Sequence, residues 1–313
     1  MKLGLIGFGN HLLNTTLTIF KKNKLFDIKC FYILNQKKGK EIEKKYNIQF
    51  INKLDEFLNQ NIDIIYINTP PSDHYKYIKK CIEKKINIIC EKPLTLSYKE
   101  TLSLYKFAEI NKVFLFEVCQ YTFHNHFIKL KQKILNDLKS NSKVNNFFYS
   151  SFKLPMQLTE NFRIKNNFDQ IIKYDLGYYP VNLIQRLFTK IKFYDEKIIN
   201  FKNKEYYKNI SFKSREVKGI IEWGIGFQYS NQVSYFSNNI FLETEYIFSK
   251  PNKCSPAIKI LKKNKLTTMS IKEENHFLNM FDSYIKIIRQ NNLRKYKLLK
   301  SNTINTIKLL SNI

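Results

Sequence analysis

A glycine-rich turn near the start of the sequence could bind a dinucleotide. Gly7 and Gly9 follow a short apolar run and precede a helix-like stretch. In a dinucleotide fingerprint the first glycine permits a tight turn, and the second lets the backbone approach the pyrophosphate at the positive end of a helix. Leu12 stands where the fingerprint has its third glycine, so the helix should pack less closely on the strand. Asn10 and His11 complete the turn, and we count both among the cofactor-binding residues.

The end of the second predicted strand bears on the choice between NAD and NADP. A protein that binds NAD commonly has an acidic residue there, which binds the ribose 2′-hydroxyl. Here the strand ends at Asn35, and Lys37 and Lys38 follow. An amide does not repel a phosphate, and an ammonium group attracts one. The sequence therefore favours NADP as the cofactor, with NAD as the alternative.

Lys92 comes soon after another apolar run, residues 86–90. Such a run is typical of a strand buried in a parallel sheet, and open α/β sheets bind ligands at the carboxyl ends of their strands. We therefore interpret Lys92 as a functional residue rather than one more surface lysine. Its ammonium group could donate a hydrogen bond to a developing oxyanion.

The elements that must position these residues alternate between strand and helix. The predicted strands are residues 3–6, 28–34, 62–68, 86–90 and 113–118, and the predicted helical stretches are 12–20, 39–46, 54–58, 75–84 and 97–109. Thr69-Pro70-Pro71 should break the helical pattern and leave the next residues in a loop. This alternation predicts right-handed βαβ units and a parallel Rossmann sheet.

After about Gln120 the sequence changes to longer β-like runs. A helix is predicted at 127–138, strands at 144–152, 191–200, 216–229 and 232–248, and a late amphipathic helix at 277–289. Partial alternation suits a largely antiparallel sheet with one open face. We predict an α/β protein with a Rossmann domain at 1–118 and a substrate-binding α+β domain at 119–313. The open face should support a homodimer or homotetramer.

Several motifs resemble those of the Gfo/Idh/MocA family, which includes glucose–fructose oxidoreductase and inositol dehydrogenase. Thr69-Pro70 with His74, then Glu91-Lys92-Pro93, are similar to the T-P-x-x-x-H loop and the E-K-P strand end of that family. Asn161-Phe162-Arg163 and the segment from Asp175 to Pro180 resemble its N-F-R and D-x-G-x-Y-P segments. The likeness covers almost the whole chain. The branch with tyrosine in the last motif includes nucleotide-sugar 3-ketoreductases.

The resemblance implies a role for each matched residue. Lys92 is the active-site lysine, Tyr179 the proton donor and acceptor, and Asp175 the carboxylate near nicotinamide and substrate. The Lys92–Pro93 bond is commonly cis in the family. The residues implied to contact the dinucleotide are Thr69, Pro70, His74 and Glu91. One departure is the stretch Asp169-Gln170-Ile171, because relatives usually carry three glycines there.

These residue types suit hydride transfer to a carbonyl group. Reduction of a ketone forms an alkoxide that needs a proton, and a positioned acid or base contributes typically ~10²–10⁴-fold. A lysine ammonium near a tyrosine stabilises the phenolate, which makes tyrosine a better base at neutral pH. We expect an NAD(P)-dependent oxidoreductase that reduces a keto-sugar, including one linked to a nucleotide. The alternatives are a sugar or inositol dehydrogenase working oxidatively, and a regulatory protein that binds the dinucleotide without turnover.

His124 and Arg163 are the candidate substrate-binding residues. His124 could line the substrate pocket or satisfy a buried hydrogen bond. Arg163 could pair with a substrate phosphate or carboxylate, or brace its own loop. His124 and His126 have no third ligand at a suitable spacing, so we expect no metal site.

Composition excludes other classes of protein. The net charge of +27 is spread along the chain and comes mostly from lysine, so we expect no specific nucleic-acid binding. No apolar run is long enough to cross a bilayer, and the first residues do not read as a signal peptide. The five cysteines are scattered, which argues against disulfides and a zinc site. We therefore expect a cytoplasmic protein that acts on a small molecule without a membrane partner.

Overall fold

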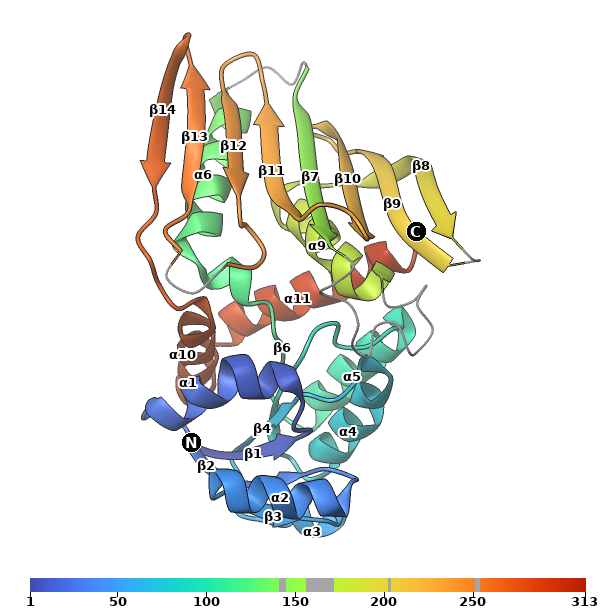
Figure 1. The fold of residues 1–313 in the computed structure, drawn as a ribbon, viewed down its shortest axis with the longest axis vertical. Helices are drawn as coiled ribbons and strands as arrows, with labels where there is room; N and C mark the ends of the chain where they lie inside the picture. Colours follow the sequence, from blue (N-terminus) through green and yellow to red (C-terminus); the bar gives the residue numbers. More distant parts are fainter. Residues whose placement is uncertain (141–144, 156–171, 202–203, 251–253) are drawn as a thin grey trace. The chain divides into compact units, whose positions relative to one another are not determined.

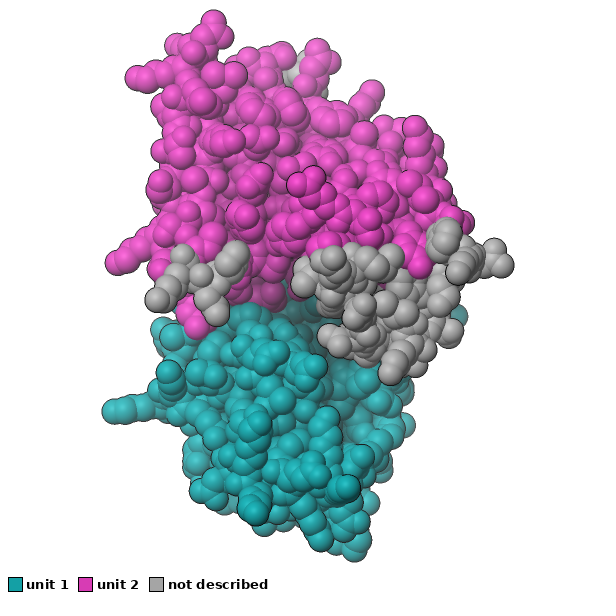
Figure 2. Space-filling model, in the orientation of Figure 1, with its two compact units in different colours: residues 1–119, 277–307 teal, residues 120–276, 308–313 magenta. Residues whose placement is uncertain are grey.

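The computed structural model describes residues 1–140, 145–155, 172–201, 204–250 and 254–313, which form two compact units (Figures 1 and 2). Unit 1 contains Met1–Cys119 and Phe277–Ile307, and unit 2 contains Gln120–His276 and Lys308–Ile313. The sequence predicts a single boundary, between residues 118 and 119. The structure differs because a late segment returns to unit 1.

Unit 1 is a Rossmann fold built on a parallel sheet. Its strands are β1 (Lys2–Ile6), β2 (Asp27–Tyr32), β3 (Gln49–Ile51), β4 (Ile64–Ile67), β5 (Asn87–Cys90) and β6 (Leu115–Glu117). Their order across the sheet is β3-β2-β1-β4-β5-β6, and every neighbouring pair is parallel. The order reverses between β1 and β4, and open α/β sheets bind ligands at the carboxyl ends beside such a reversal. The predicted parallel sheet is confirmed, and β3 is an addition to it.

The connecting helices of unit 1 correct one prediction. They are η1 (Leu12–Thr16), α1 (Leu17–Lys22), α2 (Gln36–Tyr46), α3 (Leu54–Leu58), α4 (Pro71–Glu83) and α5 (Tyr98–Ile110). The expected loop after Thr69-Pro70-Pro71 was wrong, because α4 begins at Pro71 with Pro70 as its N-cap. Proline fits the first helical position, where no backbone N–H is needed for an intrahelical bond. His74 therefore lies in a helix.

Two late helices, α10 (His276–Arg289) and α11 (Leu293–Leu310), contribute most of their length to unit 1. Phe281 on α10 packs against Phe20 and Phe26, with ring centroids 4.9 and 5.7 Å apart. Tyr296 on α11 packs against Phe116, with centroids 5.5 Å apart. These apolar faces explain why the segment joins the Rossmann unit. None of the helices in the described ranges is long and apolar enough to span a membrane.

Unit 2 is an α+β fold with a mostly antiparallel sheet. Its strands are β7 (Phe147–Leu154), β8 (Lys192–Phe201), β9 (Lys204–Lys213), β10 (Lys218–Ile225), β11 (Ser230–Phe236), β12 (Phe241–Glu245), β13 (Ala257–Lys262) and β14 (Lys265–Ser270). The order is β14-β13-β12-β11-β7-β10-β9-β8, and only the β7–β10 pair of this sheet is parallel. The run 232–248, which was predicted as one strand, contains most of β11, a turn and the whole of β12.

The helices of unit 2 cover one face of this sheet. They are η2 (Gln120–Phe123), α6 (Asn125–Ser140), η4 (Ile172–Gly177) and α9 (Tyr178–Leu187). Figure 1 shows α6 and α9 on the same side of the strands, and the helices contact β7, β10 and β13. Phe148, Trp223, Tyr235 and Leu242 form the fully buried layer beneath them. The other face of the sheet carries no helix among the described elements, as the alternation predicted.

Candidate functional site

The glycine turn has the geometry that the sequence predicted. Gly7 has φ +89°, and its backbone N–H donates to Tyr32 O over 3.0 Å. A Cβ atom at Gly7 would lie 2.4 Å from Asn68 O, so only glycine fits. At Gly9 the nearest atom to an added Cβ is Asn68 Oδ1 at 3.8 Å, which leaves that side of the turn open.

The two glycines should therefore respond differently to alanine. Gly7→Ala should lower the free energy of unfolding by about 2 kcal/mol or more, because it combines a positive φ with a backbone clash. Gly9→Ala should fold normally and weaken dinucleotide binding by about tenfold or more, since its methyl group would occupy the space that the pyrophosphate needs. Thermal unfolding and calorimetric titration measure the two effects. Normal dinucleotide affinity in the Gly9 variant would contradict this role of the turn.

Polar atoms at the end of β4 fit a dinucleotide. Asn68 Nδ2 and Thr69 Oγ1 are buried and have no hydrogen-bond partner among the described residues. Buried polar groups in folded proteins are nearly always paired, so these two atoms suit an edge that binds a polar ligand. They lie at the same sheet edge as Gly9, whose side of the turn is open. The phosphate and hydroxyl groups of a dinucleotide would supply partners for both atoms.

Glu91 connects the glycine turn to the strand end that carries Lys92. Its carboxylate lies 3.3 Å from His11 Nε2 and accepts a hydrogen bond from the hydroxyl of Tyr66 on β4. Burial alone would raise the pKa of Glu91, but the charges of His11 and Lys92 and the hydrogen bonds from His11 and Tyr66 lower it. Glu91 is therefore an ionised group that orients both His11 and Tyr66. Sequence reasoning assigned both His11 and Glu91 to the cofactor but not this pairing.

His74 has a structural position. The ring is fully buried, with Nδ1 2.9 Å from Pro93 O and Nε2 2.9 Å from Thr69 O. Burial lowers its pKa, so the ring is neutral and donates to one of these carbonyls. It joins the Thr69 loop to the Lys92–Pro93 peptide bond, which is cis as the resemblance implied. Direct contact of Pro70 or His74 with the dinucleotide stays a prediction.

Asn35 caps the helix that follows β2. Its Oδ1 accepts a hydrogen bond of 2.9 Å from Lys38 N at the start of α2. The side-chain oxygen is therefore engaged, and the amide presents its N–H donors outward from an exposed position. An N–H donor suits a phosphate, which only accepts hydrogen bonds when ionised.

In unit 2, Asp175 and Tyr179 lie one turn apart on a continuous helical stretch. Asp175 is in η4 and Tyr179 is in α9, and side chains four residues apart share a helix face. Both are half-buried, whereas Leu176 and Tyr178 are buried. A Cβ at Gly177 would lie 2.8 Å from the Trp223 indole, so the glycine of this motif permits close packing on β10.

Aromatic rings hold Tyr179 in place. Its ring centroid lies 5.0 Å from that of Phe152, 5.4 Å from Phe248 and 6.2 Å from Tyr121. Such contacts fix the orientation of the phenol ring. Tyr121 is anchored in turn, because its hydroxyl donates to Asn182 Oδ1 over 2.6 Å.

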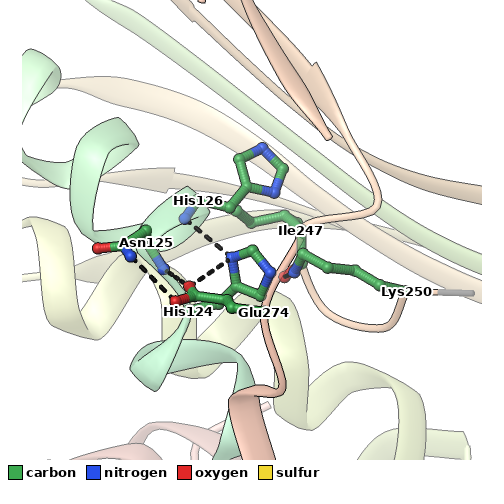
Figure 3. Close-up of polar contacts among 6 residues, drawn as sticks. All are labelled: His124, Asn125, His126, Ile247, Lys250 and Glu274. Carbon is green, nitrogen blue, oxygen red and sulfur yellow. Dashed lines mark hydrogen bonds and ion pairs between the residues drawn. The ribbon is translucent and has the colours of Figure 1, made fainter. Parts of the chain in front are cut away.

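His124 belongs to a cluster of basic groups at the start of α6 (Figure 3). The ring is buried, and Nδ1 accepts a hydrogen bond of 3.0 Å from His126 N and lies 3.2 Å from Glu274 Oε1. Burial and, after it, the charge of Lys250 lower the pKa of His124 to about 4, although the charge of Glu274 raises it. Sequence reasoning missed Glu274 and Lys250, because they come from distant segments that only the fold brings together.

Arg163, the stretch 169–171, a metal site and the cysteines were also considered in the sequence. Arg163 and the stretch Asp169-Gln170-Ile171 lie outside the described residues. Across the described ranges, no group of three His, Cys, Asp or Glu side chains could hold a metal ion. The described cysteines, all five of them, are free thiols.

Comparison with known proteins finds a family similar to the first part of this chain. Residues 1–118 match the model of an oxidoreductase family with an NAD-binding Rossmann fold, Gfo/Idh/MocA. The match covers the Rossmann part of the chain that precedes residue 119. The resemblance drawn from the motifs is thereby confirmed, and unit 1 is its dinucleotide-binding part.

Individual relatives are distant. An uncharacterized oxidoreductase of Schizosaccharomyces pombe is 31% identical over 91 residues, which are 29% of this chain and 25% of that protein. The NADP(+)-dependent scyllo-inositol 2-dehydrogenase of Bacillus subtilis is 22% identical over 193 residues, which are 60% of this chain and 52% of the dehydrogenase. The chain thus spans a quarter to about half of the length of these relatives.

A solved structure matches the whole chain. KijD10, a 3-ketoreductase from Actinomadura kijaniata in complex with NADP and TDP-benzene, aligns with a TM-score of 0.88. The alignment covers 100% of this chain and 96% of KijD10, at 14% sequence identity. At this identity the structural alignment shows a shared fold and nothing more. It confirms the predicted combination of a Rossmann sheet and a second, mostly antiparallel sheet.

Proposed function

We propose that this protein is an NAD(P)-dependent oxidoreductase that reduces a keto-sugar, including one linked to a nucleotide. The observation that carries the proposal is the half-buried Tyr179, oriented by aromatic rings and one helical turn from Asp175. Unit 1 supports it with a dinucleotide turn and with Lys92 beside the ionised Glu91. The fold shared with a 3-ketoreductase in complex with NADP and TDP-benzene agrees with this choice of substrate class.

In this proposal, proton transfer belongs to the residues of this chain. A bound reduced nicotinamide supplies the hydride. Tyr179 donates its phenolic proton to the substrate oxygen as that oxygen gains negative charge. Lys92 stabilises the phenolate that remains and donates a hydrogen bond to the developing oxyanion. Asp175 orients the substrate through its hydroxyl groups. The mechanism requires Lys92 and Tyr179 to act on the same oxygen atom.

A substrate screen tests the direction and class of the reaction. We expect loss of reduced-nicotinamide absorbance with keto-sugars and keto-sugar nucleotides. The same residues can run the reverse reaction, and a relative is an inositol dehydrogenase, so polyols with oxidised dinucleotide form the second arm of the screen. Faster oxidation of a free polyol than reduction of any keto-sugar would favour a dehydrogenase instead.

For the cofactor, we expect NADPH to bind about tenfold more tightly than NADH, the size of one charge-assisted hydrogen bond. The reason is the absence of an acidic residue at Asn35 and the presence of exposed Lys37 and Lys38. Calorimetric titration of both dinucleotides measures the preference. Replacing Lys37 and Lys38 with alanine should narrow the gap, whereas the same change at Lys40 and Lys44, further along α2, should not. Equal affinities of the wild type for NADPH and NADH would show that Lys37 and Lys38 are ordinary surface residues.

We also propose that the helix-free face of the unit 2 sheet joins two copies of this chain. Strand pairing places Phe147, Phe236 and Phe241 side by side on this face. Ring centroids lie 4.7 Å apart for Phe236 and Phe241, and 6.2 Å apart for Phe147 and Phe236. Phe147 and Phe236 are 37% and 42% exposed, which is unusual for phenylalanine.

A paired carboxylate lies on the same face of the sheet. Glu222 is 5% exposed and accepts hydrogen bonds of 2.5 Å from Tyr149 and Tyr207. Its carboxylate also lies 2.6 Å from Lys153 Nζ. Burial alone would raise the pKa of Glu222, but these partners lower it to about 2. The face therefore combines an apolar patch with a satisfied polar network, as interfaces between proteins do.

Phe236→Glu should convert the oligomer to monomer, because it places an unpaired charge in the apolar patch. Sedimentation velocity at micromolar protein concentration measures the change. Leu298→Glu is the matched control, since Leu298 is 63% exposed on α11 in unit 1. A strictly monomeric wild-type protein would remove this proposal.

A further inference from the structure

Lys250 is half-buried in unit 2, and its ammonium group has no carboxylate partner among the described residues. Its Nζ donates to Ile247 O over 3.1 Å, and no ion pair to Lys250 occurs among the described residues. Burial lowers its pKa to about 8, and the nearby Cys254 and Glu274 offset only part of that effect. A half-buried charge without a counter-ion is less favourable than one in water, so this arrangement suits a function better than it suits stability.

Three imidazole rings lie near enough to this ammonium group for its charge to lower their pKa values. The ring centroid of His124 lies 5.8 Å from that of His276 and 6.1 Å from that of His126. Burial, and after it the charge of Lys250, lowers the pKa of His126 to about 2 and that of His276 to about 3. All the rings are therefore neutral at pH 7. Figure 3 shows the Lys250 side chain extending toward the His124 ring.

Among the described carboxylates, Glu274 is the one whose charge raises the pKa of Lys250, and it has another role. Glu274 accepts hydrogen bonds from the backbone N–H of Asn125 and from Asn125 Nδ2, the latter over 2.9 Å. It thus caps the start of α6, where a negative charge is stabilised by the helix dipole. The described cluster therefore contains Lys250, three imidazoles and Glu274, whose carboxylate already accepts hydrogen bonds from Asn125.

The basic cluster lies next to the ring layer around Tyr179. Tyr121 and Phe248 both contact the Tyr179 ring, and their own centroids are 5.4 Å apart. Phe248 precedes Lys250 by two residues, and Tyr121 precedes His124 by three. The same two segments of unit 2 therefore carry the rings that contact Tyr179 and the basic groups.

We propose that Lys250, His124 and His276 form a subsite for an anionic group of the substrate, a phosphate or a carboxylate. This rests on the proposed function, because it assumes that Tyr179 acts on the substrate. An anion bound there gives Lys250 its missing counter-charge and accepts hydrogen bonds from the imidazole N–H groups. The substrate class is then a phosphorylated, nucleotide-linked or acidic sugar rather than a neutral polyol.

Histidine NMR on the full chain tests the subsite without any turnover. Inorganic phosphate, acetate and a nucleoside diphosphate are titrated separately at constant ionic strength. We expect saturable shifts of the C2–H signals of His124 and His276, with the His74 signal of unit 1 unchanged. Lys250→Met should weaken binding of the best probe by about tenfold or more, the cost of losing one charge-assisted contact. Lys265→Met, on an exposed lysine of β14, should leave it unchanged.

The probe that binds most tightly indicates which kind of substrate carries the anionic group. Tightest binding of the diphosphate indicates a nucleotide-linked sugar, and tightest binding of phosphate or acetate indicates a sugar phosphate or a sugar acid. Anion shifts that persist in Lys250→Met, or the absence of any saturable shift, would overturn the subsite. Neither result bears on dinucleotide binding or on Tyr179 chemistry, which separate measurements assess.

Thermal unfolding separates a binding role from a structural role. Without anions, Lys250→Met should unfold at the same temperature as the wild type or about 2–4 °C higher, since it removes an unpaired charge. Phosphate should raise the unfolding temperature of the wild type but not that of the variant. A variant that unfolds several degrees lower, yet still gains stability from phosphate, would show that Lys250 is structural.

Discussion

Lys92→Ala should reduce turnover of a keto-sugar by roughly 10²- to 10⁴-fold, the range for loss of a positioned acid–base group. The substitution removes both the oxyanion donor and the charge that stabilises the Tyr179 phenolate. Tyr179→Phe should reduce turnover by roughly 10²-fold or more. Dinucleotide affinity should change much less in the Tyr179 variant, because in the proposed mechanism the lost hydroxyl acts on the substrate. Stopped-flow absorbance and calorimetric titration measure the two quantities.

Controls for this pair lie close by in the chain. Tyr178→Phe makes the same change one residue earlier, at a fully buried side chain. Lys99→Ala makes the lysine change at an exposed position of α5. Both should retain near-normal turnover. The double variant at Lys92 and Tyr179 should be little worse than the more damaged single variant, because residues that act as a unit are not additive.

Two other outcomes would redirect the assignment. If Tyr179→Phe keeps near-normal turnover on a verified substrate, another group delivers the proton, and His124 is the first to examine. If no substrate is turned over but the dinucleotide binds, the regulatory alternative takes precedence.

The Rossmann unit was predictable because its signals are local. Each strand is a short apolar run, and α3 coincides with the predicted helical stretch at 54–58. The conformation of Gly7 could also be predicted, since the turn between a strand and a helix requires it. By contrast, the amphipathic pattern of α10 predicted a helix but not the sheet on which it packs. Its aromatic side chains pack on unit 1, and the periodicity of the sequence does not show which unit a helix joins.

The elements missed in unit 2 lack a clear apolar signal. Every residue of β14 except Met269 is exposed, so its sequence has no alternation to detect. α9 contains Pro180 and follows a glycine, and both residues weaken a helical pattern in a sequence, although proline is tolerated in the first helical turn. The basic cluster around Lys250 was equally invisible, because its members are up to about half the chain apart in sequence and meet only through tertiary packing.

That cluster should make unit 2 unstable in mild acid. His124 and His126 are 1% and 0% exposed, and burial is the main cause that lowers their pKa values to about 4 and about 2. In the unfolded chain a histidine has a pKa near ~6.5. Below that pH the unfolded state binds protons that the folded state excludes. The stability is therefore complete above about pH 6.5 and is lost as the pH falls toward the folded-state values.

The expected loss at pH 5 is about 2 kcal/mol for each of these two histidines, or about 4 kcal/mol together. Urea unfolding at pH 7.5 and pH 5, with hydrogen exchange to resolve the two units, measures it. His126→Gln keeps an N–H donor for Thr244 Oγ1, which lies 2.5 Å from His126 Nε2, and removes the titration. This variant should lose about 2 kcal/mol less stability between the two pH values than the wild type. His276→Gln, at a half-buried ring, should recover less. An unchanged acid-induced loss in His126→Gln would mean that burial of these imidazoles is not its cause.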